Sequence, residues 1–245
     1  MFKVWKSAVL ISVLFTWPLQ QTFAASIGAE EYSKYGDVTG NGVKDQVILR
    51  ATPIKKLDDS YKKISLQVKF GGKKRVWALG EGRHPVLTIE DVTNDGIKDV
   101  LVTMKSLTER GSVTGTVITF TNGKGHQLKL PEAIPIEAFF KDHYSAEVNA
   151  GRKKFEIDLK TRKDTYEKLG MYSKGKLNEP IELIVSEFKS LKPQYINSDK
   201  GLVSKQLISG FRREEVLGEL TTYWVYSKDG WTVKNILFSD EGIKG

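Results

Sequence analysis

Two short acidic stretches carry side chains of the types, and at the spacing, that can hold a hard metal cation. DVTGNGVKD spans residues 37–45 (loop one) and DVTNDGIKD spans residues 91–99 (loop two). In both, oxygen-bearing residues stand at alternate positions and a glycine stands at position 6, where the backbone has to bend sharply. Calcium takes about six to eight oxygen ligands, and one short loop can supply several of them. The sequence therefore predicts two calcium sites.

Each position of the loop has an expected role. Position 1 gives a carboxylate, position 3 a hydroxyl or a held water, position 5 a side-chain oxygen, position 7 a backbone carbonyl, and position 9 a closing carboxylate. At position 7 the apolar side chain is expected to anchor its loop in the core. The candidate ligands are Asp37, Thr39, Asn41, Val43 and Asp45 in loop one, and Asp91, Thr93, Asp95, Ile97 and Asp99 in loop two.

The number of carboxylates and the nature of the ion set expectations for affinity. Loop two has three carboxylates and loop one has two, so we expect loop two to bind calcium more tightly. Magnesium is less suited, because it keeps its waters and seldom sits in a cage made by protein alone. The alternative is that both stretches are tight turns without a metal, since Asp, Asn and Gly are also ordinary turn formers.

The repeated loop resembles the calcium loop of FG-GAP and VCBS repeats, which reads D-x-D/N/T-x-D/N-G-x-x-D and leads into an apolar strand. The apolar segments here are QVIL (46–49) and VLVTM (100–104). An EF-hand is a poorer match, because Ile48 and Val102 stand at position 12, where that motif needs glutamate. The resemblance covers roughly residues 33–105 and implies propeller-type β units. Two such units cannot close a ring, which takes about four to eight blades.

Alternating or apolar runs rich in β-branched and aromatic residues indicate strands through most of the chain. In the first half these runs are 62–70, 74–79, 85–91, 99–106 and 114–123. They predict a mainly β protein of antiparallel strands, with two propeller-blade-like repeats packed against a second, mostly-β half. The proline-containing stretch 130–140 marks the seam. The expected parts are residues 26–131, a two-repeat calcium-loop domain, and residues 132–245. Within the second part we expect 181–191 to be strand rather than helix, and 212–220 to form a short helical turn.

The C-terminal half carries a second resemblance. Its segments KQLISGF (205–211) and GWTVKNI (230–236) are similar to the region that follows such loops in uncharacterised secreted proteins of Bacillus-like bacteria. This likeness implies a compartment and a style of fold, and it implies no reaction.

Residues 1–24 have the layout of a secretory signal peptide. A basic start with Lys3 and Lys6 precedes an apolar run at 8–17, and Thr22 and Ala24 occupy the −3 and −1 positions of a cleavage site. The apolar run is shorter than the roughly 20 residues that cross a bilayer, although an uncleaved membrane anchor is the alternative. We therefore expect a secreted, extracellular or cell-wall-associated protein without stable membrane insertion after cleavage.

Composition narrows the choice of partners. The chain has a formal net charge of +8 and no cysteine, and loss of the two signal-peptide lysines would leave +6 (8 minus 2). A basic surface outside a bacterial cell would attract an anionic cell-wall polymer or another surface protein. The lysines are scattered and not interleaved with aromatic residues, so nucleic acid is not an expected partner. Without disulfides, stability has to come from the core or from bound ions.

The sequence offers no clear catalytic constellation. Its histidines, His84, His126 and His143, lack zinc-ligand spacing, and the chain has neither a G-x-S-x-G elbow nor a cysteine nucleophile. We expect a non-catalytic binding or interaction module that uses Ca²⁺. A secreted hydrolase of cell-wall or extracellular polymers, or a structural coat or matrix protein, are the alternatives. Trp224 and Tyr226 share one face of an expected strand, which has to be buried or to serve as a ligand patch.

Overall fold

The computed structural model describes residues 28–240, except residues 56, 58, 109, 110, 197, 198 and 229. The predicted signal peptide lies outside the described residues. Of the described residues, 63% are in strands and 4% in helices, and every strand pair among them is antiparallel. The expectation of a mainly β, antiparallel protein is therefore confirmed. In the part of the chain that is described, no helix is long and apolar enough to span a membrane.

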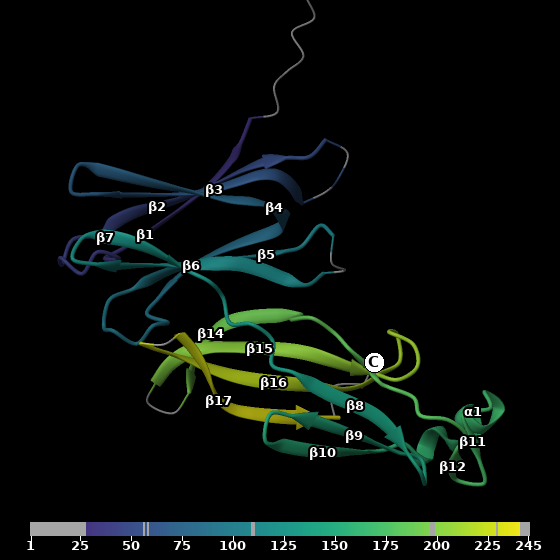
Figure 1. Ribbon diagram of the computed structural model, residues 1–245. Helices are drawn as coiled ribbons and strands as arrows, with labels where there is room; N and C mark the ends of the chain where they lie inside the picture. The colour runs from purple at the N-terminus through teal and green to yellow at the C-terminus, as the bar shows by residue number, and fades with distance from the viewer. Residues whose placement is uncertain are drawn as a thin grey trace, which may run out of the picture.

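The first half forms one seven-stranded sheet in which each strand pairs with its neighbours in sequence (Figure 1). Its strands are β1 (Glu30–Gly36), β2 (Asp45–Pro53), β3 (Ser60–Phe70), β4 (Lys73–Glu90), β5 (Asp99–Lys105), β6 (Val113–Thr121) and β7 (Lys124–Leu128). Loop one joins β1 to β2, and loop two joins β4 to β5. Both acidic loops therefore connect neighbouring strands of the same sheet.

Strand β4 changes partner along its length. It pairs with β3 from Lys73 to Arg83 and with β5 from Arg83 to Glu90. The sequence predicted two strands here, 74–79 and 85–91, and that was wrong. Gly80 and His84 have positive φ angles of 88° and 47°, which bend the strand without ending it. The sheet consequently consists of two four-stranded units that share β4, and each unit carries one acidic loop between its first two strands.

The sheet curls so that the end of β1 approaches β4. A Cβ added to Gly36 would lie 3.0 Å from Ile89 Cγ2, which shows how closely the two strands approach. The curl encloses a core whose residues alternate along each strand, as expected for a half-buried sheet. Its members include Val47, Leu49, Leu66, Val68, Val100, Val102, Ile118 and Phe120. The sheet is a curled half-barrel and not a closed propeller.

The second half contains smaller sheets and the described helices. Strands β8 (Ile136–Lys141), β9 (Ser145–Ala150) and β10 (Lys153–Asp158) form a three-stranded sheet, and β11 (Tyr172–Ser173) pairs with β12 (Lys176–Leu177). The remaining sheet holds β13 (Ile184–Val185), β14 (Ser190–Ile196), β15 (Asp199–Ser209), β16 (Val216–Ser227) and β17 (Gly230–Ser239). The short helices are η1 (Lys160–Arg162) and α1 (Lys163–Lys168).

Two local predictions for this half need correction or refinement. The short helical turn expected in 212–220 is only a hydrogen-bonded turn at 212–215, where the Glu215 N–H donates to the Arg212 carbonyl at 3.1 Å, because Val216 already begins β16 and pairs with Ser209. The helical residues lie instead at 160–168, where sequence reading expected none. The segment 181–191 is extended, as expected, but only Ile184–Val185 and the residues from Ser190 onward pair as strands.

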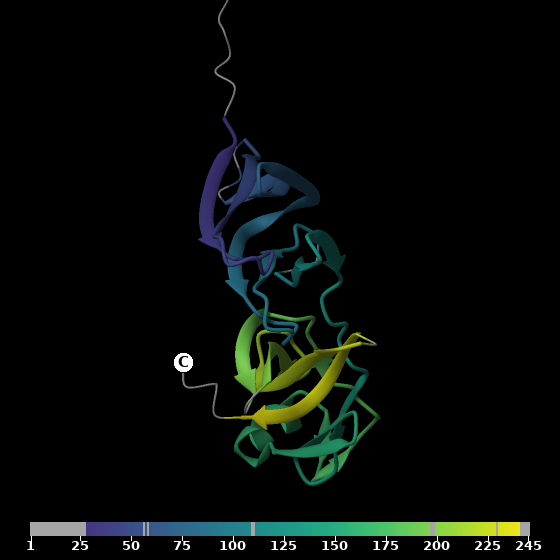
Figure 2. The same cartoon turned by 90° about the vertical axis from the view of Figure 1, so that its left-hand side faces the viewer.

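The two halves meet through a shared apolar cluster and lie one after the other along the molecule (Figures 1 and 2). Leu101 of β5 points away from the first core, since side chains alternate along a strand, and joins this cluster. The other buried members are Val92, Val117, Phe188, Leu191, Leu202 and Trp224. The predicted boundary at 131/132 falls in the connection between β7 and β8. The division of the chain into two domains at this point stays a prediction.

Candidate metal centre

The two acidic loops lie side by side. The Ile97 side chain of loop two rests on Gly40 of loop one, where an added Cβ would lie 2.8 Å from Ile97 Cδ1. Gly40 also has a φ of 72°, so both its conformation and its surroundings favour glycine. The curl of the sheet brings the loops together, although they are far apart in sequence.

The aspartate at position 9 organises each loop in the same way. In loop one, Asp45 Oδ2 accepts hydrogen bonds from the Val38 N–H (3.0 Å), the Thr39 N–H (3.1 Å) and the Thr39 hydroxyl (3.0 Å). In loop two, Asp99 Oδ2 accepts the equivalent bonds from Val92 and Thr93, at 2.8, 2.9 and 3.0 Å. The position 9 carboxylate thus ties the end of the loop to its beginning.

The aspartate at position 1 binds the backbone at the bend. Asp37 accepts bonds from the N–H groups of Gly40 (2.8 Å), Asn41 (3.1 Å) and Gly42 (2.7 Å). Asp91 accepts them from Asp95 (3.2 Å) and Gly96 (3.1 Å). The nearly identical residues of the two loops therefore fold into nearly the same hydrogen-bonded turn.

Positions 5 and 7 complete the comparison. Asn41 and Asp95 each accept a bond from the N–H group two residues later, at 2.8 Å in both loops. The expectation that the position 7 side chain enters the core was wrong for Val43, which is 64% exposed. Ile97 is half-buried against the other loop, so its anchor is a neighbouring loop and not its own core.

Asp99 differs from its counterpart by carrying an unsatisfied buried oxygen. Its side chain is 0% exposed, and Asp99 Oδ1 has no hydrogen-bond partner among the described residues. Burial raises the pKa of this carboxyl, while Thr119, Thr93 and the Val92 N–H oppose the rise. The Thr119 hydroxyl is itself buried without a well-formed hydrogen bond, but it lies close enough to moderate the pKa.

Loop two also contacts the second half of the chain. Lys200, at the start of β15, places its Nζ 3.5 Å from Asp91 Oδ2. Its backbone N–H donates to Asn94 Oδ1 at 3.4 Å. Sequence reading missed Lys200, and no local signal could have found it, because the contact joins residues 109 positions apart.

The donor set fits a hard cation in chemical type. Every candidate ligand offers oxygen, and the orphaned Asp99 Oδ1 is a buried acceptor in need of a partner. Across the described ranges, however, no three acidic, histidine or cysteine side chains are grouped closely enough to hold a metal. A calcium ion in either loop would therefore depend on threonine or asparagine side chains, backbone carbonyls and waters in addition to carboxylates.

Other residues considered from the sequence lie elsewhere. His84 is in β4, His126 is in β7, and His143 is in the turn between β8 and β9. Trp224 is buried in the shared apolar cluster between the two halves and donates its indole N–H to the Ser204 hydroxyl at 2.9 Å. The strand face that Trp224 and Tyr226 share is therefore used mainly for packing, because Tyr226 is also half-buried against Trp231.

Fold and site together define an antiparallel β protein with paired acidic loops. Residues 134–239 match the family model of the YybI C-terminal domain. The chain is also 26% identical over 202 residues to the "Uncharacterized protein YybI" of Bacillus subtilis (strain 168). The aligned region covers 78% of this chain and 77% of that protein. No solved structure matches the chain. These likenesses name no activity, so function has to be argued from the site.

Proposed function

We propose that this is a secreted calcium-binding β protein that acts as a binding or interaction module outside the cell or at its surface, without catalysis. The observation that carries the proposal is the buried, unpaired Asp99 Oδ1 in a loop whose other donors are all hard oxygens. A buried carboxylate oxygen without a partner is costly, and a bound cation would offset that cost.

The repeated architecture supports the proposal. Each four-stranded unit presents the same loop at the same place, and the side chains at position 9 and position 5 accept the same backbone hydrogen bonds in both loops. This is what two blade-like FG-GAP or VCBS repeats would present, although they form one curled sheet here. That the two four-stranded units are repeats of this kind is part of the proposal.

Calorimetry tests the calcium proposal. The melting temperature is measured in EDTA and in about 5 mM calcium, because a ligand that binds only the native state has to raise stability by mass action. We expect a rise of several degrees in calcium. The matched variant Asp99→Asn keeps an acceptor for Val92 and Thr93 but removes the charge, so its calcium response should be smaller. An unchanged melting temperature for the natural chain would refute the proposal.

The partner class follows from charge. With about +6 after loss of the predicted signal, the chain should be drawn to anionic wall polymer. Cosedimentation with purified cell walls, at low and high salt, measures this. Binding that does not weaken with salt would rule out an electrostatic partner. Zymography on the same walls examines the alternative hydrolase, and sedimentation across calcium concentrations examines a structural assembly.

A further inference from the structure

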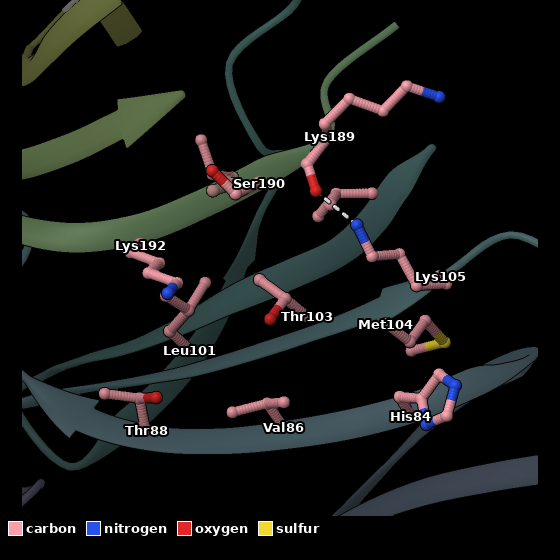
Figure 3. Close-up of a pocket in the computed structure, with 12 residues that line it drawn as sticks. His84, Val86, Thr88, Leu101, Thr103, Met104, Lys105, Lys189, Ser190 and Lys192 are labelled. Atoms are coloured by element: carbon pink, nitrogen blue, oxygen red, sulfur yellow. Dashed lines mark hydrogen bonds between the residues drawn. The ribbon is translucent and has the colours of Figure 1, made fainter. Parts of the chain in front are cut away.

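A cavity of about 440 Å³ lies between the two halves, on the face of the first sheet opposite its core (Figure 3). Along β4, His84, Val86 and Thr88 line it at alternate positions. Along β5, Leu101 and Lys105 line it in the same way. Strand β14 and the residue before it close the other side with Lys189, Ser190, Leu191 and Lys192. Ligand sites commonly lie between two packed units and have volumes of about 300–1,000 Å³.

The charge of this cavity is one-sided. None of its lining residues is acidic, whereas Lys105, Lys189 and Lys192 all contribute to its wall. Burial, followed by the charges of Lys189 and Lys192, lowers the pKa of Lys105. The Lys105 ammonium donates to the Lys189 backbone carbonyl, whereas the Lys189 side chain extends away from the cavity (Figure 3). An ammonium has three donors, so Lys105 keeps capacity for a further acceptor.

The rest of the wall mixes apolar side chains with the polar residues His84, Thr88, Thr103 and Ser190. Val86 is 53% exposed although it is a large aliphatic residue on a strand, and Val113 beside the cavity is half-buried. Leu101 and Leu191 also line the cavity, but their side chains are almost fully buried in the cluster between the halves. When only water fills the cavity, the exposed part of the Val86 side chain stays hydrated, which costs free energy. The cavity therefore combines a cationic end with an apolar bed.

We propose that this cavity binds a small amphipathic anion, with its carboxylate or phosphate head beside Lys105 and Lys192 and its apolar body on Val86 and Val113. Glu90 and Asp91 line a separate hollow of about 230 Å³ that shares only Thr88 with the cavity, and Asp59 Oδ2 lies 3.5 Å from Nδ1 of the cavity-lining His84. An anionic head is repelled from these acidic residues, so they limit where in the cavity it can bind. This site is separate from the proposed calcium ligands of loop one, and its binding does not depend on calcium.

Calorimetric titration with defined probes tests the site. The probes are hexanoate, hexyl phosphate, hexanol and inorganic phosphate, each added in EDTA so that no calcium phosphate forms. We expect hexanoate or hexyl phosphate to bind at least about tenfold more tightly than hexanol and inorganic phosphate. The tighter of the two anions identifies the head group. If neither anion binds below about 10 mM, or if hexanol or inorganic phosphate binds as well, the proposal is overturned.

Variants assign the binding to this cavity. Lys105→Met with Lys192→Met should weaken the better anion about tenfold, and Val86→Asp should do so independently by placing a charged group against the apolar body of an anionic ligand. Lys62→Met with Lys63→Met removes two exposed lysines of β3 that do not line the cavity and serves as the charge-matched control for the lysine pair, with an expected change below about twofold. Val86 is already exposed, so its substitution leaves folding intact. An unchanged affinity in Val86→Asp and in the lysine pair would overturn the assignment.

Discussion

Loop one and loop two have nearly the same sequence and the same hydrogen bonds, but they have different surroundings. Loop one is largely exposed, and its position 7 residue, Val43, faces solvent. Loop two is flanked by the second half of the chain, where Lys200 approaches Asp91, and its Asp99 holds an unpaired buried oxygen. The local turn is therefore set by the loop residues, whereas charge balance and burial are set by what packs against them.

This difference changes the expectation for affinity. Carboxylate count favours loop two, but the ammonium of Lys200 lies where it opposes a cation at Asp91. Loop one has fewer carboxylates and no such neighbour among the described ion pairs. The ranking of the two sites thus becomes a measurable balance between ligand charge and a nearby lysine.

The largest expected effect comes from deleting the position 9 side chain. Asp45→Ala and Asp99→Ala each remove the acceptor of three hydrogen bonds, two of them from backbone N–H groups. We expect each to lower the free energy of unfolding in EDTA by about 3 kcal/mol. Urea denaturation measures this. If the free energy of unfolding falls by less than about 1 kcal/mol in only one of the two variants, the loops are not structurally equivalent.

A reciprocal swap at position 4 comes next. Gly40→Asn should cost about 1.5 kcal/mol, because its new Cβ would collide with Ile97. The matched swap, Asn94→Gly, should stay within about 0.5 kcal/mol, since Asn94 already has a positive φ of 60° that glycine adopts readily, and only the weak bond donated by the Lys200 N–H is lost. Equal costs for the two swaps in urea denaturation would contradict the side-by-side packing of the loops.

The charge at position 9 distinguishes the loops further. In EDTA, Asp99→Asn should raise the free energy of unfolding by about 1 kcal/mol, because it removes a buried charge whose Oδ1 is unpaired and supplies an amide near the Thr119 hydroxyl. Asp45→Asn serves as the matched control and should change it by less than about 0.5 kcal/mol. Thermal denaturation followed by circular dichroism measures both. Destabilisation by Asp99→Asn would show that its oxygen is not orphaned.

The smallest effect concerns Lys200. In a chain whose loop one is weakened by Asp37→Asn, Lys200→Met should tighten calcium binding at loop two by about threefold, because a partly exposed pair is worth only about 0.2–1 kcal/mol. Lys63→Met in the same background is the control and should leave the affinity unchanged. Calorimetric titration with calcium gives both values. Weaker binding in Lys200→Met would mean that this lysine supports the loop instead of opposing a cation.

Much of the fold could be predicted from local pattern, and the failures have identifiable physical causes. Strands 62–70, 99–106 and 114–123 were placed closely, because alternation of apolar residues directly reports a half-buried sheet. The break expected in β4 failed because positive φ at Gly80 and His84 bent the strand without ending its pairing. The turn expected after residue 211 ends at Glu215 without becoming helical, because pairing with β15 from Val216 onward overrode a weak local preference.

The candidate site likewise has features that could be predicted from the sequence and features that could not. The ten loop residues were identified by type and spacing, and the structure arranges them as two matching turns. Whether they hold calcium stays a prediction. The orphaned Asp99 oxygen and the cavity beside Lys105 could not be predicted, because each depends on side chains from strands that meet only after folding.

By itself the sequence determined the strands, the repeat and the conformation of both acidic turns, since hydrogen bonds within about nine residues and alternate apolar positions are local properties. Only the tertiary structure decided that the loops touch each other, that Lys200 neutralises part of Asp91, and that a basic cavity opens between the halves. The reason is that burial and charge balance depend on neighbours brought together by the curl of one sheet and its packing on another.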